Sequence, residues 1–280
     1  MRLLLGLLTL LMLTGAARAE LASATVGIPE ATVRLIAGHV PGRGDMLGLH
    51  FRMHPKWKIY WRSPGDAGFP PVPDWTGSQG VGNLAIEWPL PERFRFYGLE
   101  TYGYGDEVVL PIRLDRTTSG GHIQLDLFYA ACADICVPVT ANLSLDLPPT
   151  SLPIEPRIKA ALSTVPVRSP AGLQLSARYL TKEESSSFVT PRPQGAEHGP
   201  TLVVRVKRDS PFVPDLIAEG PEGYLLETTM CWLANSGAIC FVRILDQPED
   251  ISLVGQDVTF TIWKDDYRVE ADVTVVAAED

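Results

Sequence analysis

Short segments in which apolar and polar residues alternate recur along most of the chain, and this pattern constrains the fold more than any other feature. In the segment 47–53, Leu47, Leu49, Phe51 and Met53 fall on one face. A half-buried strand has this period of two, whereas a helix repeats every three or four residues. The alternation recurs in the segments 121–128, 142–147, 201–206, 258–263 and 271–276. Because 24 glycines and 24 prolines punctuate the chain, the sequence predicts an all-β, antiparallel fold.

The first 19 residues have the features of an export signal that is removed from the mature protein. Arg2 precedes an apolar run that ends at Leu13, and Ala17-Arg18-Ala19 forms a small-x-small cleavage site. The run is shorter than the ~20 residues that a membrane-spanning helix needs, so a retained anchor is the weaker alternative. We predict a signal peptide at 1–19 and an exported mature chain.

The mature chain is acidic. Removal of the signal takes the basic residues from 24 to 22 against 33 acidic ones, so the formal charge moves from −9 to −11. A negative protein without a cluster of Lys and Arg repels the phosphate backbone, which argues against nucleic acid as a partner. Solubility is a sufficient reason for the acidity.

The length and the distribution of prolines predict two domains in tandem. Between Pro148 and Pro170 repeated prolines exclude a central strand, and only 157–164 could form a short helix. We predict a first domain at 20–150, a proline-rich linker at 151–169 and a second domain at 170–280. Short strands at intervals of about 8–12 residues favour two immunoglobulin-like antiparallel β-sandwiches, with a barrel as the alternative. The segment 183–200 is rich in Ser, Pro, Gly and charge, which predicts a mobile loop.

Cys132 and Cys136 enclose only three residues, directly after a predicted strand. Four cysteines in an exported chain are expected to form two disulfides, for which three connectivities exist. Closing so short a loop stabilises a fold by only about 2 kcal/mol. Two adjacent thiols suit reversible exchange, because one attacks a partner's disulfide and the other resolves the mixed intermediate. The spacing by itself leaves the redox and the structural role equally open, and zinc, which would need all four cysteines, is weaker.

Cys231 and Cys240 flank the turn signal Asn235-Ser236-Gly237 between two apolar runs. The pattern predicts a hairpin, and cysteines on its facing strands can come close enough to bridge. We predict a structural disulfide here, with a second redox pair as the alternative.

Other chemistry finds little support in the sequence. The five histidines are scattered, and no nucleophile elbow, metalloprotease motif or glycine-rich phosphate cradle occurs. His50 and His54 stand four residues apart on a strand-like segment, where such residues line a surface more often than they bind a metal. We predict neither a metal nor a small-molecule cofactor.

Three stretches of the sequence resemble the N-terminal periplasmic domain of the DsbD family of thiol:disulfide interchange reductases. They are most similar to the ScsB-type branch of that family. The stretches are Phe128–Pro138, Trp57–Pro70, and Phe96–Tyr102 followed by Val108–Ile112. Together they lie within about residues 45–147.

The resemblance implies an immunoglobulin-like protein-disulfide reductase domain in the periplasm. Such a domain receives electrons from membrane-embedded and thioredoxin-like donor domains and passes them to periplasmic thioredoxin-fold oxidoreductases. By position in the motif, Cys136 matches the cysteine that forms the mixed disulfide, and Cys132 matches the one that resolves it. Phe96 and Tyr97 match the cap loop, in which the aromatic ring at the position of Phe96 lies over the disulfide.

Two departures leave the partner open. DsbD itself has a wider gap between its cysteines, and the acidic pair before its cap aromatic is replaced here by Phe94 and Arg95. Full-length members continue into a helical membrane domain and a thioredoxin-like domain, whereas this sequence stops at Asp280, so we expect an excised domain or a stand-alone relative. The competing hypothesis is a β-sandwich binding or chaperone-like module with purely structural disulfides.

Overall fold

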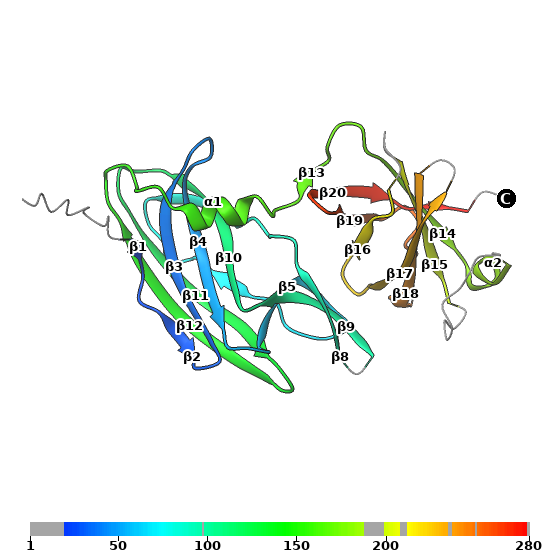
Figure 1. Cartoon of the computed structure of the whole chain (residues 1–280), viewed down its shortest axis with the longest axis horizontal. Helices are drawn as coiled ribbons and strands as arrows, with labels where there is room; N and C mark the ends of the chain where they lie inside the picture. Colours follow the sequence, from blue (N-terminus) through cyan, green and yellow to red (C-terminus); the bar gives the residue numbers. More distant parts are fainter. Residues whose placement is uncertain are drawn as a thin grey trace, which may run out of the picture.

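A computed structural model shows two β-sandwiches that follow one another along the chain (Figure 1). It describes residues 20–96, 98–187, 199–207, 212–234, 237–249 and 251–278, without the side chains of Phe96 and Ser187. Most strands in these ranges pair antiparallel, so the predicted all-β class with two immunoglobulin-like sandwiches is confirmed. The predicted signal peptide lies outside the described residues. Neither helix in the described part is long and apolar enough to cross a membrane.

The first sheet of the N-terminal sandwich has the strand order β1-β3-β4-β10-β7, with β2 paired to β3. Its strands are β1 (Leu21–Ala22), β2 (Val26–Ile28), β3 (Ala31–Val40), β4 (Gly44–Met53), β7 (Val81–Ile86) and β10 (Glu107–Arg116). The predicted inward face of β4 is confirmed, because Leu47, Leu49, Phe51 and Met53 are all buried in the sandwich core.

The second sheet has the order β12-β11-β5-β9-β8, with β6 paired to β11. Its strands are β5 (Lys58–Gly65), β6 (Val72–Asp74), β8 (Glu92–Phe96), β9 (Leu99–Gly105), β11 (Gly121–Cys132) and β12 (Cys136–Leu147). The predicted inward residues Ile123, Leu125 and Leu127 of β11 pack against the first sheet with no exposed surface. The opposite face of this sheet carries the cysteines.

The outer face of β4 is buried as well, because a helix covers it. α1 (Pro156–Leu162) begins after Glu155, whose side chain accepts a hydrogen bond from the Arg157 backbone amide. Ile158 of this helix is fully buried in a small cluster with apolar residues of β3, β4 and β10. Part of the stretch assigned to the linker from its prolines therefore packs on the first sandwich. The domain division itself stays a proposal.

Close approach of the backbone brings this stretch onto β3. The His39 amide donates to the Pro153 carbonyl at 2.7 Å, and a Cβ at Gly38 would overlap the side chain of Glu155. Only glycine leaves room for the chain here.

The C-terminal sandwich consists of one sheet with the order β13-β20-β19-β16 and another with the order β17-β18-β15-β14-β21. The first contains β13 (Val167–Arg168), β16 (Asp215–Glu219), β19 (Asp257–Lys264) and β20 (Tyr267–Thr274). The second contains β14 (Gln174–Leu180), β15 (Thr201–Lys207), β17 (Leu225–Ala234), β18 (Gly237–Asp246) and β21 (Val276–Ala277). The two sheets enclose a core of their own, which includes Val204, Phe260 and Ile262.

Two sequence predictions in this half need correction. The segment 271–276 is not one strand: β20 ends at Thr274, the Val275 amide donates to the Gln256 carbonyl, and β21 joins the other sheet beside β14. The segment 183–200 begins in helix α2 (Lys182–Ser187) instead of a loop. Thr181 and Glu184 form a reciprocal capping box at its start, which favours a helix. Residues 188–198 lie outside the described residues.

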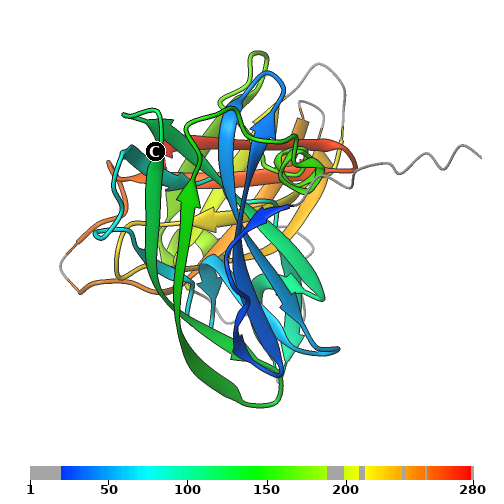
Figure 2. The ribbon, with the colours of Figure 1, turned by 90° about the vertical axis from the view of Figure 1, so that its left-hand side faces the viewer.

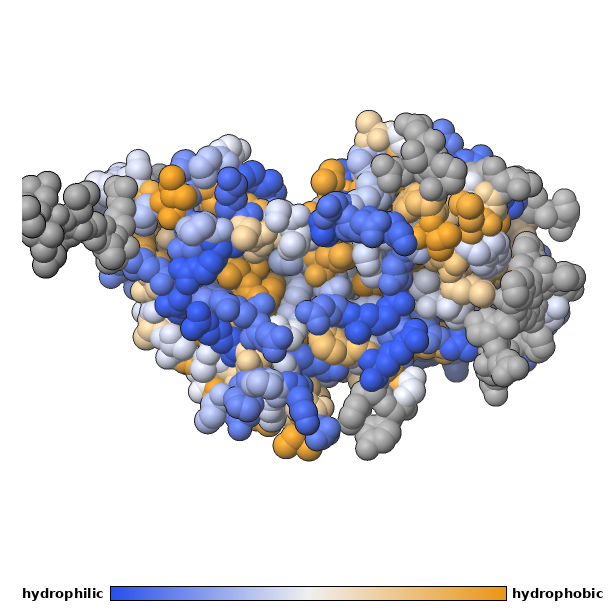
Figure 3. Space-filling view, viewed as in Figure 1, coloured by the Kyte–Doolittle hydropathy of each residue, from blue (hydrophilic) through white to orange (hydrophobic). Residues whose placement is uncertain are grey.

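The two sandwiches meet through side chains of β5 and β8. Arg62 on β5 forms ion pairs with Glu219 and Glu270 of the C-terminal half. Ile217 and Trp263 pack against the core cluster of the first sandwich. Figure 2 views the molecule with the N-terminal sandwich in front. Figure 3 shows the face seen in Figure 1, on which hydrophilic residues lie at the junction of the two halves with some apolar residues among them.

Candidate functional site

Cys132 and Cys136 form a disulfide at the free end of the β11–β12 hairpin. The two residues are the last pair of the β11–β12 ladder, and the Ala133 amide donates to the Ile135 carbonyl within the loop that joins them. Cross-strand partners point to the same face of a sheet. The bond therefore lies on the outer face, opposite the side on which Tyr129 and Ala131 enter the core.

The two sulfur-bearing residues differ in exposure. Cys132 is 1% exposed and packs with Tyr60 and Ala130, whereas Cys136 is exposed. Cys136 is therefore the residue of the pair that a protein partner can approach from solvent, whereas Cys132 is shielded. In thiol–disulfide exchange a nucleophile must approach one sulfur of the bond, so access selects which cysteine reacts first.

Tyr60 and Lys58 on β5 stand beside the disulfide. The hydroxyl of Tyr60 is 3.7 Å from the Cys136 sulfur, and burial raises the pKa of this phenol. Lys58 lies directly opposite Cys132 in the β5–β11 register. The backbone of Gly68, at a φ of +124°, packs on the Tyr60 ring so closely that a Cβ would come within 2.3 Å of it.

Aromatic rings and a threonine hold the Lys58 ammonium. Its nitrogen donates to the Thr101 hydroxyl at 2.9 Å and lies 4.6 Å from the centre of the Phe94 ring. The Tyr60 ring centre is 5.5 Å away. Burial lowers the pKa of this ammonium. These contacts join β5, β8 and β9, and they hold the ammonium toward β9 and β8, on the other side of β5 from β11 and Cys132.

Exposed apolar side chains continue the outer face away from the cysteines. Phe128 shares this face of β11 with Cys132, and its ring meets Phe69 edge-on at 4.9 Å. Val72 of β6 is the cross-strand partner of Phe128. Ile135 lies in the loop between the cysteines with 68% of its surface exposed. The exposed residue Cys136 therefore follows Ile135, and further exposed apolar side chains lie along the same sheet face.

The predicted cap residues fall at the tip of the β8–β9 hairpin. Phe96 is the last residue of β8 and pairs with Leu99 of β9, in the same sheet as the disulfide. The Phe96 side chain and all of Tyr97 lie outside the described residues, so the cap role stays a prediction.

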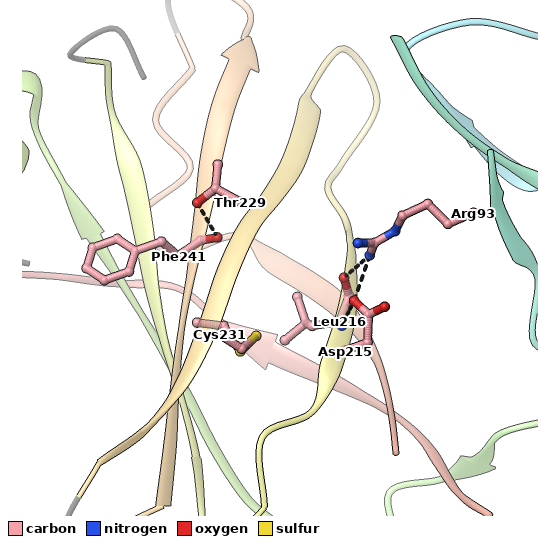
Figure 4. The surroundings of a disulfide bond; sticks show 7 residues. Arg93, Asp215, Leu216, Thr229, Cys231 and Phe241 are labelled. Carbon is pink, nitrogen blue, oxygen red and sulfur yellow. Dashed lines mark hydrogen bonds and ion pairs between the residues drawn. A yellow bond between two sulfur atoms is a disulfide. The ribbon is translucent and has the colours of Figure 1, made fainter. Parts of the chain in front are cut away.

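The base of that hairpin is held by the C-terminal sandwich. Arg93 on β8 donates to the Asp215 carboxylate at 2.8 Å and to the Leu216 carbonyl at 3.2 Å, as Figure 4 shows. Arg93 also pairs with the buried Glu100 of β9 at 3.3 Å.

Cys231 and Cys240 form the second disulfide, in the middle of the β17–β18 hairpin. Cys240 has no exposed surface and belongs to the core of the C-terminal sandwich, and Cys231 packs against that core. Figure 4 shows Cys231 near the hydrogen bond from the Thr229 hydroxyl to the Phe241 carbonyl. The predicted turn residues Asn235 and Ser236 lie outside the described residues.

Each cysteine pair is bonded within itself, so the arrangement in which all four would share one zinc ion is not formed. His50 does not line the surface as its spacing predicts. It is buried on the outer face of β4, between the Arg34 guanidinium and the Glu107 carboxylate. Sequence reasoning also missed Lys58 and Tyr60 as neighbours of the disulfide. Their alternate spacing places them on one face, but it does not say which strand they meet.

The fold and this site define a β-sandwich protein with an asymmetrically exposed disulfide at a strand end. Residues 28–148 match the family model described as thiol:disulfide interchange protein DsbD, N-terminal. This part of the chain is thus similar to the DsbD N-terminal family, whose name describes thiol:disulfide interchange.

A solved structure resembles the whole chain. It is the N-terminal periplasmic domain of ScsB from Proteus mirabilis, with a TM-score of 0.70 and 24% sequence identity. The match covers 92% of this chain and 99% of that one, so both sandwiches have counterparts in that fold. No curated protein matches the sequence.

Proposed function

We propose that this chain is a periplasmic thiol:disulfide oxidoreductase domain that relays electrons through Cys132 and Cys136. One observation carries the proposal: in a domain that matches the model of a thiol:disulfide interchange family, the residue Cys136 is exposed while Cys132 is 1% exposed. A relay needs one cysteine that partners can reach and a second, adjacent cysteine that resolves the mixed disulfide.

The relay runs in two half-reactions. A donor thiolate attacks the Cys136 sulfur, the disulfide breaks, and its electron pair leaves on Cys132. The donor's second thiolate then attacks the donor sulfur of this mixed disulfide, which releases Cys136 as a thiolate and leaves the donor oxidised. Two electrons and, after protonation, two protons have moved to this domain.

Delivery to the acceptor reverses these roles. The Cys136 thiolate attacks a sulfur of the acceptor's disulfide and releases the acceptor's other sulfur as a thiolate. Cys132 then attacks the Cys136 sulfur, restores the Cys132–Cys136 bond and frees the reduced acceptor. We propose membrane-embedded or thioredoxin-like domains as donors and periplasmic thioredoxin-fold oxidoreductases as acceptors. The export signal predicted at 1–19 and the family of the domain support this location.

In the same proposal the Cys231–Cys240 bond is structural. The burial of Cys240 in the core supports this assignment, and so does Cys231, which is half-buried and therefore less open to a partner than the exposed Cys136.

Trapping tests the proposed relay. We expect Cys132→Ala to accumulate mixed disulfides with periplasmic proteins through Cys136, because the intermediate has lost its resolving thiol. The matched variants are Cys136→Ala, which should trap far less, and a Cys231→Ala, Cys240→Ala double variant of the intact relay, which should trap nothing. Trapping only by Cys136→Ala would reverse the two roles. Trapping by neither would favour a binding module with structural disulfides.

A further inference from the structure

Opening the Cys132–Cys136 bond by attack on Cys136 creates a thiolate at Cys132, a residue that is shielded from solvent. When a thiolate attacks the exposed Cys136 sulfur, the leaving group is the Cys132 thiolate, at a residue that is 1% exposed. An anion removed from water is costly unless a cation or hydrogen-bond donors compensate it. The chemistry proposed above therefore calls for a positive group next to Cys132.

Lys58 offers a positive charge on the strand next to Cys132, with its ammonium held on the β9 and β8 side of β5 in the disulfide form. It is the cross-strand partner of Cys132, and such partners in an antiparallel pair have Cβ atoms about 4.5–5.5 Å apart on the same face. The Thr101 hydroxyl and the rings of Phe94 and Tyr60 hold the ammonium, and these groups carry no formal charge. Among the described residues no carboxylate perturbs it, since burial is the one cause that shifts its pKa.

We propose that Lys58 is a positioning residue of the redox pair, whose ammonium stabilises the Cys132 thiolate each time the disulfide opens. The inference rests on the proposed function and deepens it by naming the group that favours the leaving thiolate. The other titratable groups near this place are Tyr60 on the same strand, Glu92 on β8, whose carboxylate lies near Gly105 opposite Lys58, and the two cysteines of β11 and β12.

The charge acts in both directions of the relay. A leaving thiol of lower pKa departs faster, so Lys58 speeds the attack of the donor on Cys136. The same charge favours the thiolate form of Cys132, which is the form that resolves a mixed disulfide with the acceptor. An arginine at this position would keep the charge, whereas methionine would keep only the apolar stem.

The test measures how fast dithiothreitol reduces Cys132–Cys136 in the full chain at neutral pH. Lys58→Met should slow the reaction about threefold, the effect of roughly one unit in the pKa of the leaving thiol at a Brønsted slope of about 0.5. Lys58→Arg should recover most of the rate. Lys56→Met is the matched control, because it removes an exposed lysine two residues away and should leave the rate unchanged.

Titration of the reduced protein, followed by the ultraviolet absorbance of the thiolates, gives a second readout. Lys58→Met should move the thiol titration to higher pH, and Lys58→Arg should return it toward the wild-type position. If Lys58 had a purely structural role, Lys58→Met would leave the thiol titration at its wild-type position, and Lys58→Arg would have no shift to reverse. If Lys58→Met fails to fold, Lys58→Gln, which can still donate to Thr101, replaces it with the same expectation.

Equal reduction rates and titrations in Lys58→Met and wild type would overturn the inference. That outcome is separable from failure of the relay itself. Trapping by Cys132→Ala with unchanged Lys58→Met kinetics would remove only the role of Lys58, whereas absence of trapping would remove the proposed function.

Discussion

The two disulfides of this protein have nearly the same local geometry and opposite surroundings. Each joins directly opposed residues on neighbouring antiparallel strands, with Cα atoms 4.1 Å apart. Cys132–Cys136 is the last pair of its ladder, and one of its residues is exposed. Cys231–Cys240 lies inside its ladder and includes a core residue with no exposed surface.

The comparison teaches that strand pairing alone does not decide what a disulfide does. A loop of three residues and a hairpin both bring the sulfurs together. What differs is the exposure of the cysteines and the residues near them: Tyr60 contacts the first bond and Lys58 pairs with Cys132 on the next strand, whereas apolar core residues border the second bond. Variants of each cysteine pair and of the residues near them test this difference between the two bonds.

The largest expected effect is on stability. Replacing Cys231 and Cys240 by Ala should lower the free energy of unfolding of the C-terminal sandwich by about 3 kcal/mol, from the loss of the cross-link. Loss of core packing at Cys240 adds to this. Electron transfer through the first pair should persist. Urea unfolding, together with an exchange assay on the same protein, measures both effects.

The matched variant replaces Cys132 and Cys136 by Ala. It should lose less stability, about 2 kcal/mol, because the loop it opens is shorter. Exchange activity should vanish completely. A larger loss of stability from this variant than from the hairpin variant would contradict the contrast between a structural and a redox bond.

A cap over the first disulfide predicts a smaller, kinetic effect. Phe96→Ala should let noncognate oxidants reoxidise the reduced Cys132 and Cys136 several-fold faster, because the cap limits access to the thiols. Its cost in stability should stay below the roughly 3–5 kcal/mol of a buried Phe→Ala change. Leu233→Ala, at an exposed apolar residue of the C-terminal sandwich, is the control.

The opposite result would place Phe96 in the core. In that case the variant would unfold with a large loss of stability, and the fraction that remains folded would oxidise at the wild-type rate. The cap assignment would then fail even if the relay stands.

The smallest effect concerns acid. Burial lowers the pKa of His50 in the first sandwich, so below the ordinary histidine value of 6.5 the unfolded chain binds a proton that the folded chain does not. Folding of this sandwich should therefore weaken as the pH falls from about 7 to about 5. Thermal unfolding of His50→Gln should show a flatter dependence over that interval.

Ser144→Ala provides the control for this measurement. Ser144 is an exposed residue of the same sandwich and carries no titratable group, so its replacement should leave the pH dependence as it is in the wild type. An equal flattening by both substitutions would show that burial of His50 is not the cause.

Local pattern was enough to predict much of this molecule. Alternation in the segments 47–53 and 121–128 placed the right side chains inward, because a strand's two faces follow from its period of two. The spacing around Cys231 and Cys240 predicted a hairpin with a bridge, and the hairpin and bond are present. These features depend on residues that are near one another in the sequence.

Long-range features were not predictable in the same way. The register that sets Lys58 opposite Cys132 joins strands that are far apart in the chain, so no local pattern reveals it. The same holds for α1 on the outer face of β4, which buries His50, and for the crossing from β20 to β21 after Val275. Contacts of Arg62 and Arg93 with the other sandwich likewise depend on how two separate folds meet.

The central claim is that one disulfide reacts and the other holds the fold, and stepwise reduction of the intact chain tests it most directly. The protein is exposed to increasing amounts of a mild thiol reductant, the free thiols are alkylated, and mass mapping assigns each modified cysteine. We expect Cys132 and Cys136 to be alkylated first, while Cys231 and Cys240 remain oxidised until the C-terminal sandwich unfolds. Equal opening of both bonds, or earlier opening of Cys231–Cys240, would contradict it.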